Sequence, residues 1–142
     1  MTPHAPYLHR VAVAASPRDA FALFTSGMGE WWDPAYTPEP ATFTGIDLQP
    51  VVGGELAMVH GEERYVVGRV RQWREGHEVV LELWLGMPAA APSELRVSFV
   101  EEGEVCLVEL VHGGWTPENL EHRRRFTDWP LLLGWFARAC AR

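Results

Sequence analysis

Residues 129–140 of the chain are WPLLLGWFARAC. Apolar side chains recur there at spacings of three and four residues, which is the period of a helix with one apolar face. The stripe consists of Trp129, Leu132, Leu133, Phe136, Ala137 and Cys140. Asp128 precedes it as a candidate N-cap, and Pro130 falls in the first turn, where a missing N–H costs little. The stretch therefore predicts a C-terminal helix whose apolar face packs against another layer of the protein.

That other layer is predicted to be a sheet. Between residues 41 and 112, apolar or alternating stretches are separated only by short turns rich in glycine, proline and polar residues. The candidate strands are 41–49, 54–59, 64–73, 78–84, 94–101 and 104–112. A parallel return needs a crossover of a dozen or more residues, so strands joined this closely pair as antiparallel hairpins.

The amino-terminal part adds a strand and a helix. Residues 7–14 are predicted as the opening strand. Ser16 is followed by a proline and then by an acid at the third helical position, which is the pattern of a capped helix start. The stretch 33–40 then carries three prolines, which exclude regular structure.

We expect residues 1–142 to form one α+β domain, because no repeat, linker or low-complexity tract divides the chain. The predicted order is strand, helical segment, six antiparallel strands and C-terminal helix. Thr116, followed by proline, predicts a further helical start ahead of that last helix.

Composition excludes several classes of function. All 12 basic residues are arginine, so Schiff-base chemistry and the phosphate-binding lysine of a P-loop are ruled out. The net charge of −7 argues against nucleic acid as a partner, and no apolar run is long enough for a membrane span. The first residues lack the features of a secretory signal, so a cytoplasmic location is expected.

Neither a metal nor a cofactor is expected. No histidines or cysteines stand at ligand spacing, and Cys106 and Cys140 lie far apart in apolar stretches, which predicts buried thiols. His112 is the candidate reactive group. If Val108 and Leu110 face the helix, so does His112, because strand side chains alternate. It is then a satisfied core histidine, an anchor for a ligand or a catalytic group.

The opposite face of the same strand is also mostly apolar. It carries Val105, Leu107, Glu109 and Val111. If this face points outward, it is a candidate surface for a homodimer.

Several short motifs, in this order, resemble those of the SRPBCC superfamily (START-like, helix-grip). They are Ser16-Pro17, Trp31-Trp32, Gly53-Gly54-Glu55, Gly68-Arg69-Val70, Val111-His112-Gly113-Gly114-Trp115 and Trp129-Pro130. Within the superfamily the chain is most similar to the subfamily of homologues of the heat-shock ATPase activator Aha, which has many uncharacterised bacterial members. The resemblance covers nearly the whole chain.

The resemblance implies a helix-grip fold, in which a curved seven-stranded antiparallel sheet wraps around a long C-terminal helix and leaves an internal cavity. It places the loops 33–40, 60–63 and 86–93 around the cavity mouth. Members of the superfamily bind apolar molecules, and some are cyclases or dehydratases. It carries no invariant catalytic set onto this sequence.

The leading functional hypothesis is a small-molecule binding protein that holds an apolar or aromatic ligand between sheet and helix. The expected ligand-binding residues are Trp31, Trp32, Tyr65, Phe99, Val108, Leu110, His112, Trp129, Leu133 and Phe136. One alternative is a cyclase or dehydratase with His112 as proton shuttle. Another, resting on the resemblance alone, is a chaperone-associated module.

Overall fold

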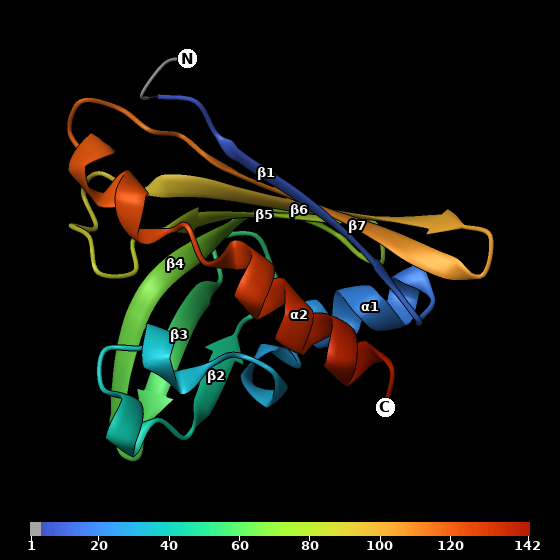
Figure 1. The fold of residues 1–142 in the computed structure, drawn as a ribbon. Coiled ribbons are helices and arrows are strands. Elements are labelled where there is room, and N and C mark those ends of the chain that lie inside the picture. Colours follow the sequence, from blue (N-terminus) through green and yellow to red (C-terminus); the bar gives the residue numbers. More distant parts are fainter. Residues whose placement is uncertain (1–3) are drawn as a thin grey trace.

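The computed structural model describes residues 4–142 and shows a curved antiparallel sheet with a helix lying across its concave face (Figure 1). The strands are β1 (Tyr7–Val13), β2 (Gly45–Leu48), β3 (Glu55–His60), β4 (Glu63–Arg74), β5 (Glu78–Leu83), β6 (Ser93–Glu102) and β7 (Val105–Gly113). The helices are α1 (Pro17–Phe24) and α2 (Trp129–Cys140), with 3-10 turns η1 (Met28–Glu30), η2 (Pro34–Tyr36), η3 (Pro40–Thr42) and η4 (Leu120–Arg125).

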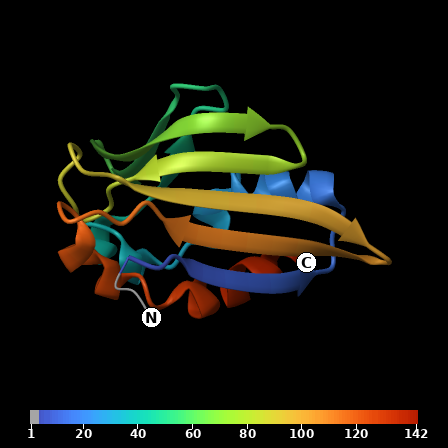
Figure 2. The same ribbon diagram turned by 90° about the horizontal axis from the view of Figure 1, so that it is seen from above.

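The sheet has seven strands in the order β1-β7-β6-β5-β4-β3-β2, and every neighbouring pair is antiparallel. Strands β2 to β7 follow one another as hairpins, whereas β1 pairs with the last strand. From above, the strands lie side by side with the helices beneath them (Figure 2). This architecture confirms the predicted α+β helix-grip fold.

The alternation along β7 decides which side chains face the helices. Cys106, Val108, Leu110 and His112 are buried, while the residues between them are partly exposed. The predicted parity is therefore correct, and His112 lies on the inner face.

Aromatic contacts hold the two helices against the sheet. The Phe24 ring of α1 lies 5.9 Å from Phe99 on β6 and 5.2 Å from Phe136 on α2, measured between ring centroids. Trp31, which follows α1, contacts both Phe24 and Phe136. Such edge-to-face pairs add to the free energy of apolar burial, so α1, α2 and β6 meet in one continuous core.

Two predicted boundaries are wrong, and one predicted cap lacks its hydrogen bond. The strand predicted at 41–49 is shortened to Gly45–Leu48, because Pro40 begins the 3-10 turn η3. The helical start at Thr116 leads only into a turn and the 3-10 helix η4. Asp128 precedes α2 as predicted, but its carboxylate makes no hydrogen bond to the helix N–H groups.

The sheet bends where β3 pairs with β4. The register shifts between Leu56 and Ala57, so that Val67 is an extra residue on β4, and such bulges increase the local bend of a strand. Gly68 comes next. A Cβ there would lie 2.6 Å from the backbone oxygen of Glu82, so only glycine allows β5 to approach β4 this closely.

We expect Gly68→Ala to destabilise the protein by roughly 1–3 kcal/mol, the usual cost of overpacking. Gly45→Ala is the matched control, because a Cβ there meets nothing within 4 Å. Urea unfolding followed by tryptophan fluorescence measures both variants. Equal stability of the two would contradict the proposed role of Gly68.

Candidate functional site

A cavity of about 360 Å³ lies between the η2 loop, the end of β5 and the beginning of α2. The η2 loop and α2 lie on the same side of the sheet (Figure 1). The lining residues are Trp32, Ala35, Tyr36, Thr37, Pro38, Leu83, Leu85, Gly86, Arg125, Phe126, Asp128, Trp129 and Leu132. The volume is near the lower end of the range for small-molecule sites.

The walls of the cavity are mostly apolar and aromatic. The rings of Trp32 and Trp129 meet edge to face, with centroids 6.0 Å apart. The indole N–H of Trp32 donates to the backbone oxygen of Tyr36 at 3.1 Å, so this tryptophan presents ring surface to the cavity while its polar atom is satisfied within the protein.

The polar side chains of the lining include Tyr36, Asp128 and Arg125. The Tyr36 hydroxyl donates to Asp128 Oδ2 at 2.5 Å, and this bond raises the pKa of Tyr36. Arg125 Nη2 donates to the backbone oxygen of Gly86 and, at 2.6 Å, to His122 Nδ1. The cavity thus combines an apolar interior with one cation, one carboxylate and the hydroxyl-bearing residues Tyr36 and Thr37.

His112 lies behind the cavity wall, with none of its surface exposed. Trp129 Nε1 donates to His112 Nδ1 at 3.1 Å, and His112 Nε2 lies 2.8 Å from Ser93 Oγ. The Ser93 hydroxyl in turn donates to the backbone oxygen of Leu83 at 2.8 Å. Each polar atom in this buried chain therefore has a partner.

The chain of bonds determines the form of the imidazole. Nδ1 accepts a hydrogen bond from the indole N–H of Trp129, and the hydroxyl proton of Ser93 is directed to the backbone oxygen of Leu83, so His112 is neutral and donates from Nε2. Burial, and secondarily the charge of Arg123, lower the pKa of His112 from its ordinary 6.5 to about 3. The aromatic rings of Trp115 and Phe126 also pack on it, with centroids 4.7 and 4.6 Å away.

Comparison with known protein families shows to which family the chain belongs. The model of the family described as "Activator of Hsp90 ATPase homolog 1-like protein" matches residues 14–138. The chain belongs to this family. The predicted placement in the SRPBCC superfamily, in its Aha-like branch, is therefore confirmed. Among curated proteins, the sequence has no significant match.

Solved structures share the fold of this Aha-like chain. The Aha1 dimer from Colwellia psychrerythraea has 19% identity and a TM-score of 0.71 over 96% of each chain. The anthrahydroquino-gamma-pyrone synthase Txn09, complexed with SUM, has 25% identity and a TM-score of 0.68 over 97% of this chain and 99% of its own. The self-sacrificing resistance protein CalC from Micromonospora echinospora has 24% identity and a TM-score of 0.71 over 98% and 96%. Family and fold support a ligand-binding domain of the SRPBCC type.

The structure distributes the ten predicted ligand-binding residues over three environments. Trp32 and Trp129 line the cavity. Tyr65 is half-buried on β4, where its hydroxyl donates to Glu63. The other seven belong to the buried interior outside the cavity lining: Trp31, Phe99, Val108, Leu110, His112, Leu133 and Phe136.

Sequence reasoning missed the polar part of the lining. Tyr36 lies in the proline-rich stretch, Asp128 was interpreted only as a helix cap, and Arg125 was assigned no role in a site. Of the three loops expected at the mouth, 33–40 and 86–93 contribute lining residues, whereas 60–63 contributes none. The positions of helix starts and prolines cannot show that these segments converge.

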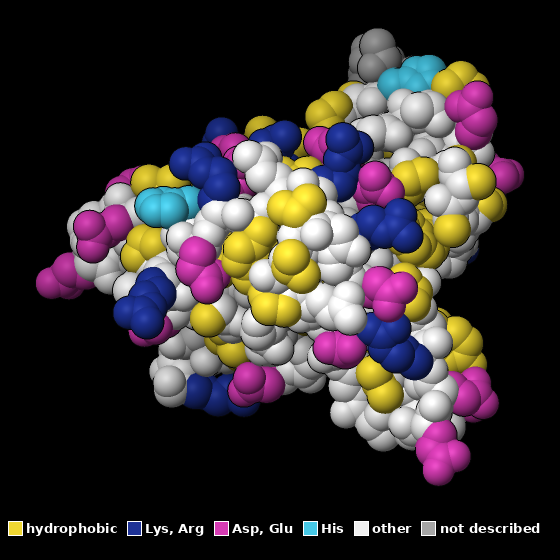
Figure 3. Space-filling model, turned by 180° about the vertical axis from the view of Figure 1, so that it is seen from behind, with side chains coloured by type: hydrophobic (Ala, Val, Ile, Leu, Met, Phe, Trp, Pro, Cys, Tyr) yellow, Lys and Arg dark blue, Asp and Glu magenta, His cyan; other side chains and the backbone are white. Residues whose placement is uncertain are grey.

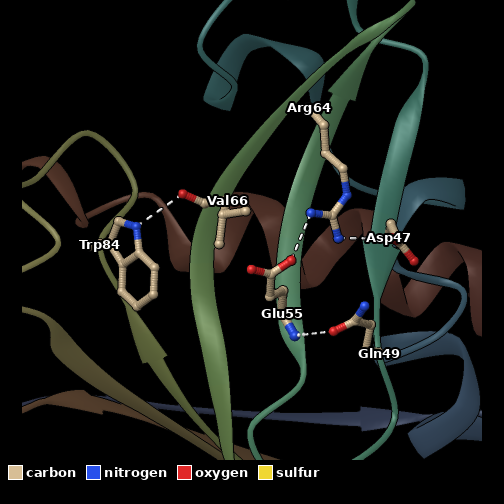
Figure 4. A network of polar contacts seen from close by, with 6 residues as sticks. All are labelled: Asp47, Gln49, Glu55, Arg64, Val66 and Trp84. Carbon is tan, nitrogen blue, oxygen red and sulfur yellow. Dashed lines mark hydrogen bonds and ion pairs between the residues drawn. The ribbon is translucent and has the colours of Figure 1, made fainter.

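Trp73 on β4 and Trp84, which directly follows β5, do not line the cavity. Trp84 donates to the backbone oxygen of Val66, beside a polar network that joins β2, β3 and β4 (Figure 4). In this network Arg64 pairs with Glu55 at 2.8 Å and Asp47 at 3.0 Å. On the face seen in Figure 3, arginine and acidic side chains are interspersed. Exposed pairs of this kind add little to stability.

Other reactive groups give no second site. Cys106 is buried and Cys140 half-buried; both thiols are free, and burial raises the pKa of Cys140 to about 11. Within residues 4–142, no three His, Cys, Asp or Glu side chains come together in a way that would hold a metal ion. No helix in that range is long and apolar enough to cross a bilayer.

The lowered pKa of His112 predicts a loss of stability in acid. Between pH 6.5 and about 3 the unfolded chain binds a proton that the folded protein does not, so stability falls as the pH falls. The slope approaches about 1.4 kcal/mol per pH unit for this one group. Urea unfolding at a series of pH values measures it.

His112→Gln should reduce that slope, whatever its effect on stability at neutral pH. His77→Gln, at an exposed turn, is the control and should retain the slope of the unaltered protein. An unchanged slope in His112→Gln would show that His112 is not the group responsible.

Proposed function

We propose that the protein binds a mostly apolar, aromatic small molecule in the cavity between the sheet and α2. The observation that carries this proposal is the cavity itself, whose wall presents Trp32, Trp129 and Phe126 together with leucine side chains. The flat surface of an aromatic ligand can pack against such rings, stacked or edge to face. Each Å² of apolar surface that binding removes from water contributes about 25 cal/mol to the binding free energy.

The comparisons give independent support. The relative at 25% identity is named as an anthrahydroquino-gamma-pyrone synthase and is complexed with SUM. A protein of the same fold that is named as the synthase of an aromatic compound supports an aromatic ligand for this chain as well.

Catalysis through His112 has little support from the geometry. A proton shuttle must reach its substrate and exchange protons near neutral pH. His112 is enclosed, has both ring nitrogens bonded and has a pKa far below neutrality. Binding is therefore the better proposal, and a chaperone-associated role rests on the family name alone.

Leu85→Arg should abolish or strongly weaken binding, because it puts a charge on the apolar wall. Leu131→Arg is the matched control, since Leu131 is exposed on α2 and does not line this cavity. Fluorescence titration with the neutral dye Nile red measures both. We expect an affinity loss of at least about tenfold for Leu85→Arg and little change for the control.

Mass spectrometry of extracts from freshly purified protein complements the titration, because a co-purifying molecule identifies the ligand directly. If no small molecule is extracted and Nile red shows no saturable site, the proposed function is wrong.

We also propose that two copies associate through the outer face of β1, β7 and β6, which Figure 2 shows from above. On this face Leu107 lies between Ala12 and Val100, and Val111 lies next to Leu8. Leu8 and Val100, on the two strands that flank β7, are 51% and 56% exposed, an unusual setting for large apolar side chains. The dimeric state of the Aha1 relative supports a second copy as the occupant.

Leu107→Glu places two like charges in that interface and should convert dimer into monomer. Light scattering coupled to size-exclusion chromatography measures the mass, and Gln72→Glu, exposed on β4, is the control. A mass unchanged by Leu107→Glu would count against this interface.

A further inference from the structure

We propose that the cavity selects aromatic ligands that carry a neutral hydroxyl group, which Asp128 and Arg125 recognise. This inference rests on the proposed function and names the class of ligand. It comes from the two charged side chains among the cavity-lining residues and from how the protein uses their atoms.

Asp128 offers one free carboxylate oxygen. Its Oδ2 accepts from the Tyr36 hydroxyl, while Oδ1 accepts no hydrogen bond from any residue in the described range 4–142. The carboxylate neither caps α2 nor forms an ion pair with any described cation. Tyr36 therefore orients Asp128 and leaves an acceptor for a ligand O–H.

Arg125 offers free donors. Its two hydrogen bonds both come from Nη2, to the backbone of Gly86 and to His122, so Nη1 and Nε keep N–H groups that no side chain or backbone oxygen of the described chain accepts. No described carboxylate lies within ion-pair distance, including Asp128 three residues away.

The absence of a side chain at Gly86 leaves room for the Arg125 guanidinium. A Cβ at Gly86 would lie 3.2 Å from Arg125 Nη1, and the backbone there has a φ of +67°, which side chains other than glycine rarely adopt. The guanidinium thus lies against the bare backbone of the loop after β5, at the cavity wall.

The two charges together discriminate between ligand types. A singly charged ligand is attracted by one of the two groups and repelled by the other, so the pair favours neither sign of charge. A hydrocarbon displaces water from both groups and returns no hydrogen bond, which costs binding free energy. A hydroxyl on an aromatic ring donates a hydrogen bond to the carboxylate, and an oxygen of the ligand accepts a hydrogen bond from the guanidinium.

Three naphthalene probes of similar size test the inference: 2-naphthol, 2-methoxynaphthalene and 2-methylnaphthalene. The first offers a donor and an acceptor, the second an acceptor only and the third neither. Their affinities are measured by displacement of Nile red. For the unaltered protein we expect 2-naphthol to bind best, by about tenfold over 2-methylnaphthalene, with 2-methoxynaphthalene between them.

Two variants separate the roles of the charged groups. Asp128→Asn retains an oxygen for Tyr36 but turns an N–H₂ toward the ligand, so 2-naphthol should lose its advantage over 2-methoxynaphthalene. Arg125→Met removes the donors, so both oxygen-bearing probes should weaken. Arg124→Met, an exposed neighbour outside the cavity lining, is the matched control and should behave as the unaltered protein does.

Binding of 2-methylnaphthalene serves as the check on folding in every variant, because it depends only on the apolar wall. If all three probes bind the unaltered protein equally, or if the variants weaken all three equally, this inference is overturned while cavity binding stands. If neither Nile red nor any probe binds, the proposed function fails with it.

Discussion

The hydrogen bond between Trp129 and His112 is the constraint on which the site depends. It joins the first residue of α2 to the inner face of β7, and Ser93 extends the chain of bonds to the backbone of β5. A buried polar group costs several kcal/mol unless it is satisfied, so the helix can begin only where the indole N–H meets the imidazole. The same bond sets the plane of Trp129, whose ring forms part of the cavity wall.

The aromatic residues of the continuous interior therefore form two groups, one that packs the core and one that borders the cavity. Phe24, Trp31 and Phe136 pack against one another between the helices, and none of them lines the cavity. Trp32 and Trp129, at the other end of α2, contact each other only edge to face and border the open space. The carboxyl-terminal half of α2 is thus densely packed, whereas its amino-terminal end borders the cavity.

Periodicity was enough to predict the strand arrangement and the inner face of β7, because each depends on alternation within one segment. It failed where two segments compete for the same group. Asp128 has the sequence position of a cap, yet one oxygen of its carboxylate accepts a hydrogen bond from the Tyr36 hydroxyl, 92 residues away, and neither caps the helix. Likewise, nothing near His112 in the sequence shows that Phe126 and Trp129 enclose it and place it outside the cavity lining.

The position of β1 at the edge beside β7 has a consequence for folding. Strands β2 to β7 each find their partner in the next hairpin, but the Arg10–Glu109 contact joins residues 99 positions apart. Closing a loop of that length costs about 4 kcal/mol of chain entropy, far more than closing a short turn. On the ribosome the first strand to be synthesised is thus the one whose partner is made last, and until β7 emerges the amino-terminal strand has no place in the sheet.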